Sequence, residues 1–191
     1  MIQRCGWAGP EQIYIDYHDH EWGVPIFDDR RLFEFLILEG AQAGLSWITV
    51  LKKRDAYRQL FHNFDAEKIA RFSSTQIAHL LHNSAIIRNR LKIESTITNA
   101  RAFLTLREQQ GSFSDYLWQF VDGRPVQNHW KTDRQIPAAT KTSEAMSRDL
   151  KQRGFRFVGP TICYAYMQAV GMVNDHITRC YRHRQVAKLG N

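Results

Sequence analysis

The chain has 191 residues, 43% of them hydrophobic and 24% charged, so it is long enough to bury a core and has the composition of a globular protein. Its 26 Lys and Arg against 19 Asp and Glu give a formal charge of +7, which suits a polyanionic partner or simply a basic surface. No apolar run approaches the roughly 18 residues that a membrane span requires, and three Cys are too few and too uneven for a disulfide scaffold.

The first residues contain no apolar segment of the kind that a signal peptide requires. The sparse cysteines suit a reducing compartment, so we expect a cytoplasmic protein. Nothing in the sequence indicates an assembly larger than a monomer. The length fits one domain over 1–191, with two helical lobes as a variant of the same arrangement.

Helical periodicity dominates the chain, and strand-like alternation is nearly absent, which predicts an all-α fold. Asp28 or Asp29 can cap the helix expected at 31–38, Asp65 can cap the helix expected from residue 66, and Ser143 can cap the helix expected at 143–153. The segment 122–142 contains Gly123 and two prolines and is expected to be irregular. The expected helices cover residues 31–38, 45 to about 61, 66 to about 72, 74 onwards, 84–107, 113–121, 143–153 and 161–171.

The turn from Gly154 to Pro160 lies between two of these helices and has the pattern of a helix-hairpin-helix. Such a hairpin can bind DNA without reading its sequence, because glycines let the backbone approach a phosphate and the second helix presents free N–H groups. An ordinary αα-hairpin has the same local sequence features. The turn therefore indicates DNA binding without establishing it.

Two cysteines and two histidines form a candidate metal-ligand set, Cys5, His18, His176 and Cys180. His176 and Cys180 are four residues apart, which places them on one helical face, and Cys2His2 is a ligand set typical of structural zinc. A zinc ion here would tie the N-terminal segment to the last expected helix, which carries His176 and Cys180. The alternative is two buried cysteines and two unrelated histidines among eight.

An acidic residue and several aromatic residues gather in the first fifty positions. Glu39 lies in the apolar run Leu36–Ala41, and Trp7, Tyr17, Trp22 and Trp47 surround it in the sequence. Aromatic rings can stack on a cationic base while a carboxylate accepts hydrogen bonds from its exocyclic amine. The alternative is a set of core tryptophans and an exposed helical Glu.

Six strings in one order, spread over nearly the whole chain, resemble the 3-methyladenine-DNA glycosylase I family. The segment 111–142 contributes little to this resemblance. The strings are RCGW at 4–7, YHD at 17–19 with EWGVP at 21–25, LEG at 38–40 with AGLSWITVL at 43–51, IRNR at 87–90, GFRFVG at 154–159 and VNDH at 173–176.

The resemblance implies a helix-hairpin-helix DNA glycosylase fold with a structural zinc ion at Cys5, His18, His176 and Cys180. Its implied substrate is double-stranded DNA that contains alkylated bases. It implies that Glu39 acts as the catalytic residue and, with Tyr17, as a hydrogen-bonding partner of the base. Trp47 would stack on the base, and Trp7 and Trp22 would flank it. Gly44 and Leu45 would fill the gap left by a flipped nucleotide, and Val158, Gly159 and Thr161 would contact DNA at the hairpin.

Two positions depart from the wider helix-hairpin-helix superfamily. Thr161 stands where lyase-active relatives carry a Schiff-base lysine, and Asn174 stands at the position of the catalytic aspartate. The resemblance therefore implies a monofunctional hydrolase of base excision repair, which releases 3-methyladenine and leaves an abasic site. Asp175 is a candidate substitute acid, although its place beside His176 favours a role in supporting that ligand.

Two other classes of function are compatible with the same residues. A non-enzymatic, zinc-stabilised DNA-binding module would use the hairpin and the basic surface, and it predicts that Glu39 and the tryptophans do not share a cavity. A zinc-stabilised protein-interaction domain would carry its positive charge incidentally, and it predicts DNA binding that is weak and insensitive to salt.

Overall fold

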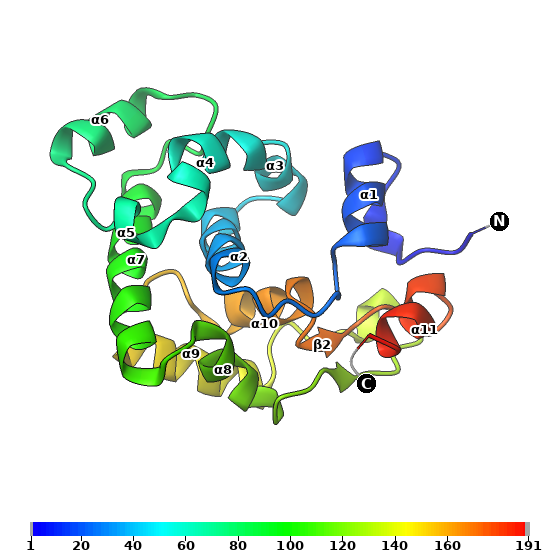
Figure 1. The fold of residues 1–191 in the computed structure, drawn as a ribbon. Helices are drawn as coiled ribbons and strands as arrows, with labels where there is room; N and C mark the ends of the chain where they lie inside the picture. Colours follow the sequence, from blue (N-terminus) through cyan, green and yellow to red (C-terminus); the bar gives the residue numbers. More distant parts are fainter. Residues whose placement is uncertain (1, 190–191) are drawn as a thin grey trace.

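The computed structural model describes residues 2–189, and α-helices dominate this part of the chain (Figure 1). The α-helices are α1 (Gln12–His20), α2 (Asp29–Gln42), α3 (Trp47–Leu51), α4 (Arg54–Leu60), α5 (Ala66–Ile69), α6 (Ser74–His82), α7 (Arg90–Gln110), α8 (Phe113–Trp118), α9 (Lys141–Gln152), α10 (Pro160–Ala169) and α11 (Tyr181–Ala187). Short 3-10 helices are η1 (Gly6–Ala8), η2 (His62–Phe64), η3 (Gln119–Val121) and η4 (Asp133–Gln135). The all-α prediction is confirmed.

Helices α2 and α10 lie at the centre of the molecule. Helix α10 packs against both α2 and α9, and the long helix α7 packs against α2, α5, α6 and α8. Helices α1 and α11 lie on the same side of this arrangement (Figure 1), and the Tyr181 N–H at the start of α11 donates to the Gln3 carbonyl at 3.1 Å. None of the helices within residues 2–189 is both long enough and apolar enough to cross a membrane.

Several predicted helix starts are confirmed by side-chain caps. The Asp28 carboxylate accepts the backbone N–H of Arg31 at 2.9 Å and begins α2, and Asp65 caps α5 in the same way. Ser73 and Gln76 form a capping box at the start of α6. These helices begin where the sequence places a short polar side chain that can satisfy free N–H groups.

Several predicted boundaries are wrong: α2 extends beyond residue 38 to Gln42, and α5 ends at Ile69 instead of near residue 72. Three others are as follows. The helix expected from residue 45 to about 61 is two helices, α3 and α4, and the break lets Arg54 donate two hydrogen bonds to Glu21. Helix α7 begins at Arg90 instead of residue 84, because the Asn89 side chain accepts the backbone N–H of Lys92 and caps the helix there. Helix α9 is capped by Thr140, and Ser143 is the third helical residue, whose hydroxyl accepts the Thr140 N–H.

The segment 122–140 is irregular, as predicted, except for η4 and one short strand, whereas residues 141 and 142, also expected to be irregular, begin α9. Strand β1 (Val126–Gln127) pairs in parallel with β2 (Val173–Asn174). Helix α1 and this strand pair were not predicted. The expectation that His176 and Cys180 lie on one helical face is wrong, because residues 176–180 form a turn and α11 begins only at Tyr181. The pairing fixes the irregular segment beside the chain that follows α10.

Candidate functional site

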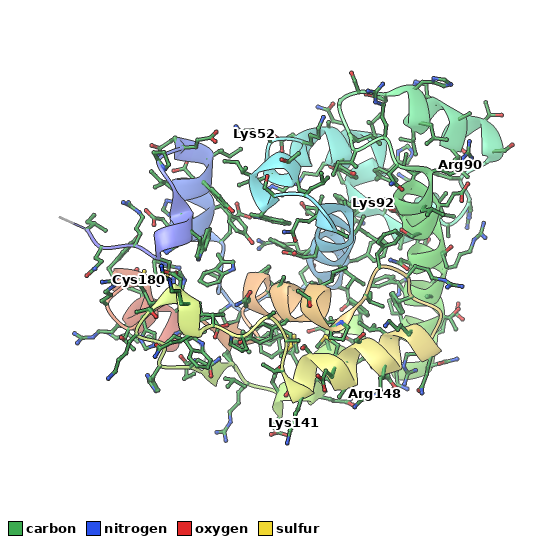
Figure 2. The ribbon with its side chains drawn as sticks, turned by 180° about the vertical axis from the view of Figure 1, so that it is seen from behind. Lys52, Arg90, Lys92, Lys141, Arg148 and Cys180 are labelled. Atoms are coloured by element: carbon green, nitrogen blue, oxygen red, sulfur yellow. The ribbon has the colours of Figure 1, made fainter. Side chains whose placement is uncertain are left out.

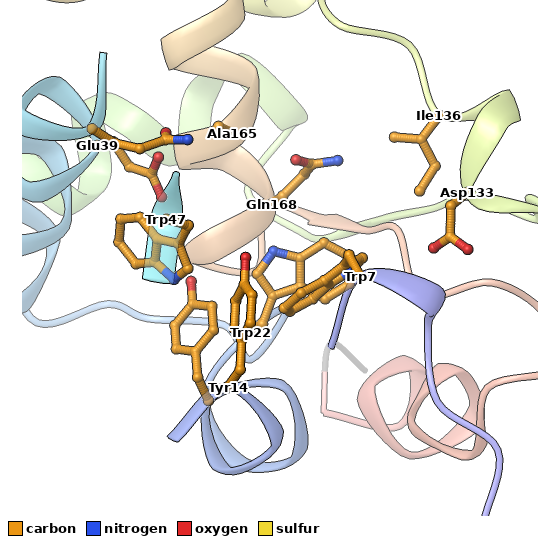
Figure 3. A pocket seen from close by; sticks show the side chains of 11 residues that line it. Trp7, Tyr14, Trp22, Glu39, Trp47, Asp133, Ile136, Ala165 and Gln168 are labelled. Carbon is orange, nitrogen blue, oxygen red and sulfur yellow. The ribbon is translucent and has the colours of Figure 1, made fainter. Parts of the chain in front are cut away.

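The five residues of the predicted base pocket all line one cavity of about 360 Å³ (Figure 3). They come from η1, α1, the turn after α1, α2 and α3, and the remaining walls come from α10 and the η4 region. The other six lining residues were not predicted from the sequence. These are Tyr14, Gln42, Asp133, Ile136, Ala165 and Gln168.

The Glu39 side chain reaches this cavity from the last turns of α2 and is only 4% exposed. It makes no hydrogen bond to any residue in the described range 2–189. Burial raises the pKa of Glu39 to about 8, because a carboxylate loses hydration when it leaves water. Next to it, a Cβ atom on Gly40 would lie 3.2 Å from the Phe157 side chain, so glycine lets α2 pack closely against the turn before α10.

Aromatic rings form most of the remaining wall around Glu39. The Tyr17 and Trp47 ring centroids are 5.4 Å apart, and those of Trp7 and Trp22 are 4.8 Å apart with an edge-on orientation. Tyr17, Trp22 and Trp47 are buried, and Trp7 is half-buried. The indole N–H of Trp47 is buried without a hydrogen-bond partner among the described residues. The cavity therefore presents flat aromatic faces, one carboxylate and a free donor.

Cys5, His18, His176 and Cys180 form one buried cluster that could hold a metal ion, since their four ligand atoms lie within 4.8 Å of one another. The Cys180 sulfur is 3.5 Å from His18 Nε2 and 3.6 Å from His176 Nδ1, and the Cys5 sulfur is 3.6 Å from His176 Nδ1. A tetrahedral zinc site with ordinary bond lengths has sulfur–nitrogen separations of roughly 3.6 Å. The donor set and its spacing therefore fit a tetrahedral ion.

The second nitrogen of each histidine in the cluster is held by a hydrogen bond. His18 Nδ1 donates to the Asp19 carboxylate at 2.8 Å, and Asp19 in turn accepts hydrogen bonds from Arg4. His176 Nε2 donates to the Trp22 carbonyl at 3.0 Å. These bonds select the ring nitrogens that face the cluster, as is typical of metal-binding histidines.

Asn174 and Asp175 lie outside the cavity lining. Asn174 is fully buried and donates to the Gln127 side chain and to the His183 carbonyl. The Asp175 carboxylate accepts hydrogen bonds from four side chains and makes none to His176. Both alternatives considered for Asp175, a substitute acid and a support for His176, are therefore unsupported by its contacts. The four donors are Asn128 Nδ2, Trp130 Nε1, Tyr164 OH and Gln168 Nε2, at 2.7–2.8 Å.

The hairpin expected to meet DNA consists of α9, the turn 153–159 and α10. Gly154 has φ +90°, and Phe157 adopts a left-handed conformation with φ +54°. Gly159 is half-buried and Thr161 is exposed at the first turn of α10. Val158 as a whole is only 1% exposed, and its carbonyl accepts hydrogen bonds from Ser147 and Cys163, so its burial does not support the predicted contact with DNA.

The other candidate DNA contacts lie in the loop after α2. Gly44 has φ +77° with open space around it, and the Leu45 side chain is 41% exposed. Lys92 from α7 donates to the carbonyls of Ala41 and Ala43 at 2.8 and 2.6 Å, which holds the end of α2 just before this loop. Leu45 is thus an exposed apolar side chain on a tethered loop.

An all-helical chain with this hairpin and an aromatic, carboxylate-bearing cavity beside it has the fold of the helix-hairpin-helix DNA glycosylases. Residues 7–183 match the family model for methyladenine glycosylase, and the chain belongs to that family. It is 50% identical to the DNA-3-methyladenine glycosylase of Haemophilus influenzae over 180 residues, which cover 94% of this chain and 97% of the relative. It is also 50% identical to DNA-3-methyladenine glycosylase 1 of Escherichia coli K12, over 94% of this chain and 96% of the relative.

Two solved structures extend this comparison. A crystal structure of a 3-methyladenine DNA glycosylase I superposes with a TM-score of 0.92 at 53% identity, covering 94% of this chain and 98% of its own. The Staphylococcus aureus enzyme, whose structure concerns 3-methyladenine recognition, superposes with a TM-score of 0.91 at 35% identity, covering 93% and 95%. Fold and sequence thus agree on the family.

Proposed function

We propose that this chain is a DNA glycosylase that hydrolyses the N-glycosidic bond of 3-methyladenine in alkylated double-stranded DNA. The observation that carries the proposal is the buried, unpartnered Glu39 carboxyl group in an aromatic cavity. Burying such a group without a partner is costly, so a ligand that supplies the missing hydrogen bonds and charge gains affinity there. The similarity to relatives named for this activity supports the proposal.

The chemistry of the lesion suits this cavity. N3-alkylation makes the base cationic, so the Glu39 carboxylate attracts the charge and accepts from the exocyclic amine, while Trp47 and Tyr17 contact the electron-poor ring. The alkylated base leaves as a neutral molecule and needs little help from an acid. Orientation of the flipped nucleotide and preferential binding of the transition state then supply the acceleration. Asn174, which is buried and already hydrogen-bonded, has no part in this scheme.

The DNA would lie across the hairpin and the loop after α2. The first turn of α10 at Gly159 and Thr161 would bind a phosphate through backbone N–H groups, and Leu45 would occupy the space of the flipped nucleotide. Basic side chains lie on the neighbouring helices: Arg90 and Lys92 on α7, and Lys141 and Arg148 on α9 (Figure 2). The alternative of a non-enzymatic DNA-binding module predicts that Glu39 and its neighbouring tryptophans do not share a cavity. In the structure, Glu39 lines one cavity together with Trp7, Trp22 and Trp47.

Two finer features complete the proposal. The ion held by Cys5, His18, His176 and Cys180 is zinc, because two thiolates and two imidazoles match its preferred tetrahedral donors and leave no open position for water. When bound, it supplies a structural tie between the two ends of the single domain 1–191. The enzyme leaves an intact abasic site, since Thr161 offers no amine that could form a Schiff base.

The test is excision from methylated duplex DNA, with the released bases separated by chromatography. The parent protein should release 3-methyladenine, and Glu39→Gln should release less and bind the free base more weakly by about 1.5–3 kcal/mol, the range for a hydrogen bond to a charged group. Affinity for undamaged duplex, measured at matched salt, should stay the same because the phosphate contacts remain. Absence of released 3-methyladenine from the parent protein would refute the proposed function.

A further inference from the structure

Gln168 lines the same cavity as Glu39 but comes from a different wall, near the C-terminal end of α10. Its side chain is half-buried and projects into the cavity beside Ala165 (Figure 3). The proposed function assigns it no role. Its importance depends on which end of its amide faces the bound base.

The orientation of the Gln168 amide is fixed by Asp175. The Gln168 Nε2 atom lies 2.7 Å from Asp175 Oδ2. Asp175 also faces the N–H groups of Asn128 and Trp130 and the hydroxyl of Tyr164, at 2.7–2.8 Å. Because all four neighbours can donate, the carboxylate acts as an acceptor throughout, and the amide must turn its NH2 group toward it.

The opposite end of the amide, its carbonyl oxygen, therefore faces away from Asp175. Figure 3 shows this oxygen on the side of Gln168 that is nearer to Glu39. It accepts no hydrogen bond from a side chain or backbone group in the part of the chain that the structure describes. The cavity thus contains two acceptors on two walls, the Glu39 carboxylate and the Gln168 carbonyl oxygen.

We propose that Gln168 is a specificity-determining residue that accepts a hydrogen bond from the exocyclic amine of the alkylated purine. This inference rests on the proposed function. An amine at the 6-position can donate an N–H group to the Gln168 carbonyl oxygen. A purine with an oxygen at the same position would instead place an acceptor against the Gln168 carbonyl oxygen, which cannot donate. The pocket therefore selects 6-amino over 6-oxo purines.

Asp175 is the positioning residue for this contact. It keeps the amide from rotating by about half a turn, which would present NH2 to the cavity and favour the 6-oxo purines instead. Its other three hydrogen bonds come from the segment 128–130 and from α10, so the carboxylate itself is held in place. A residue outside the cavity lining thus determines what the cavity accepts.

The test compares the binding of two free bases, 3-methyladenine and 3-methylhypoxanthine, which carries an oxygen in place of the amine. Gln168→Met keeps the length of the side chain but removes the acceptor, and Gln59→Met is the matched control on an exposed site of α4. We expect Gln168→Met to reduce the preference for 3-methyladenine by about 2- to 12-fold, the effect of one neutral hydrogen bond, and Gln59→Met to leave it unchanged. Equal weakening of both bases, or an unchanged preference, would overturn the inference.

Asp175→Asn tests the positioning role separately. An asparagine can donate as well as accept, so the Gln168 amide becomes free to turn, and the preference for 3-methyladenine should fall while the bound metal content stays that of the parent. If the preference is retained, Asp175 does not position Gln168. The excision assay on the parent protein distinguishes this inference from the proposed function. If the parent releases 3-methyladenine but Gln168→Met leaves the base preference unchanged, only the inference about Gln168 is wrong.

Discussion

Replacing Glu39 by glutamine should change how the stability of the protein depends on pH. Burial raises the pKa of Glu39 to about 8, whereas its ordinary value is 4.5. Between these two values the folded protein holds a proton that the unfolded chain has released. Folding is therefore favoured at the low end of this range, and the free energy of unfolding falls as the pH rises. Glutamine carries no such proton and removes this dependence.

The size of the effect follows from the two pKa values. From pH 5.5 to pH 7.5 the contribution of Glu39 to the free energy of unfolding should fall by about 2.5 kcal/mol, since a full pH unit is worth about 1.4 kcal/mol. Other groups titrate equally in both proteins, so they cancel in the difference. From pH 5.5 to pH 7.5, the free energy of unfolding of Glu39→Gln should therefore rise by about 2.5 kcal/mol relative to that of the parent protein.

The assay is urea denaturation of both metal-saturated proteins at pH 5.5 and pH 7.5, with Glu108→Gln as a control. Glu108 is an exposed residue of α7, and its replacement should leave the pH dependence unchanged. If the parent and Glu39→Gln lose or gain the same stability between the two pH values, Glu39 is hydrated or paired in solution. The account of the cavity would then be wrong.

Three other predictions concern the metal, the reaction and the stacking contact. Removal of the metal by a chelator, or Cys180→Ala, should lower the melting temperature, and an unchanged melting temperature would show that the ion is not structural. Borohydride should trap no covalent protein–DNA adduct during turnover; a trapped adduct would reveal an amine nucleophile. Trp47→Ala should weaken binding of free 3-methyladenine by about 1–3 kcal/mol in a fluorescence or NMR titration, and parent-like affinity would exclude stacking on this ring.

The sequence was most informative where a helix start has a capping side chain, as at Asp28, Asp65 and Ser73. It was misleading in 84–89, where apolar residues continue the helical spacing although the Asn89 cap begins α7 only afterwards. Helices α1 and α11 are short, so whether they form depends more on their packing against the rest of the chain than on the periodicity of their own residues. That the chain acts as a monomer stays a prediction.

The pocket residues could be proposed because the family resemblance singled out Glu39 and its aromatic neighbours. The metal-ligand set was ambiguous on spacing alone, because its halves lie more than 150 positions apart and only the fold brings them together. Gln168 could not have been found from the sequence. Its role depends on the direction of an amide, which is fixed by a hydrogen bond to Asp175 that no spacing rule predicts.

The aromatic wall of the cavity and the metal-ligand cluster are interleaved along the chain and in space. Trp7 follows Cys5 by two residues, Tyr17 directly precedes His18, and the Trp22 ring lies 4.6 Å from that of His176. Most of the wall is made by residues 7–47, whereas its support, His176 and Cys180, is synthesised more than 100 positions later. During synthesis the cavity therefore remains incomplete until residues 176–180 have been made, and a product truncated before residue 176 would lack a working pocket even if its central helices had folded.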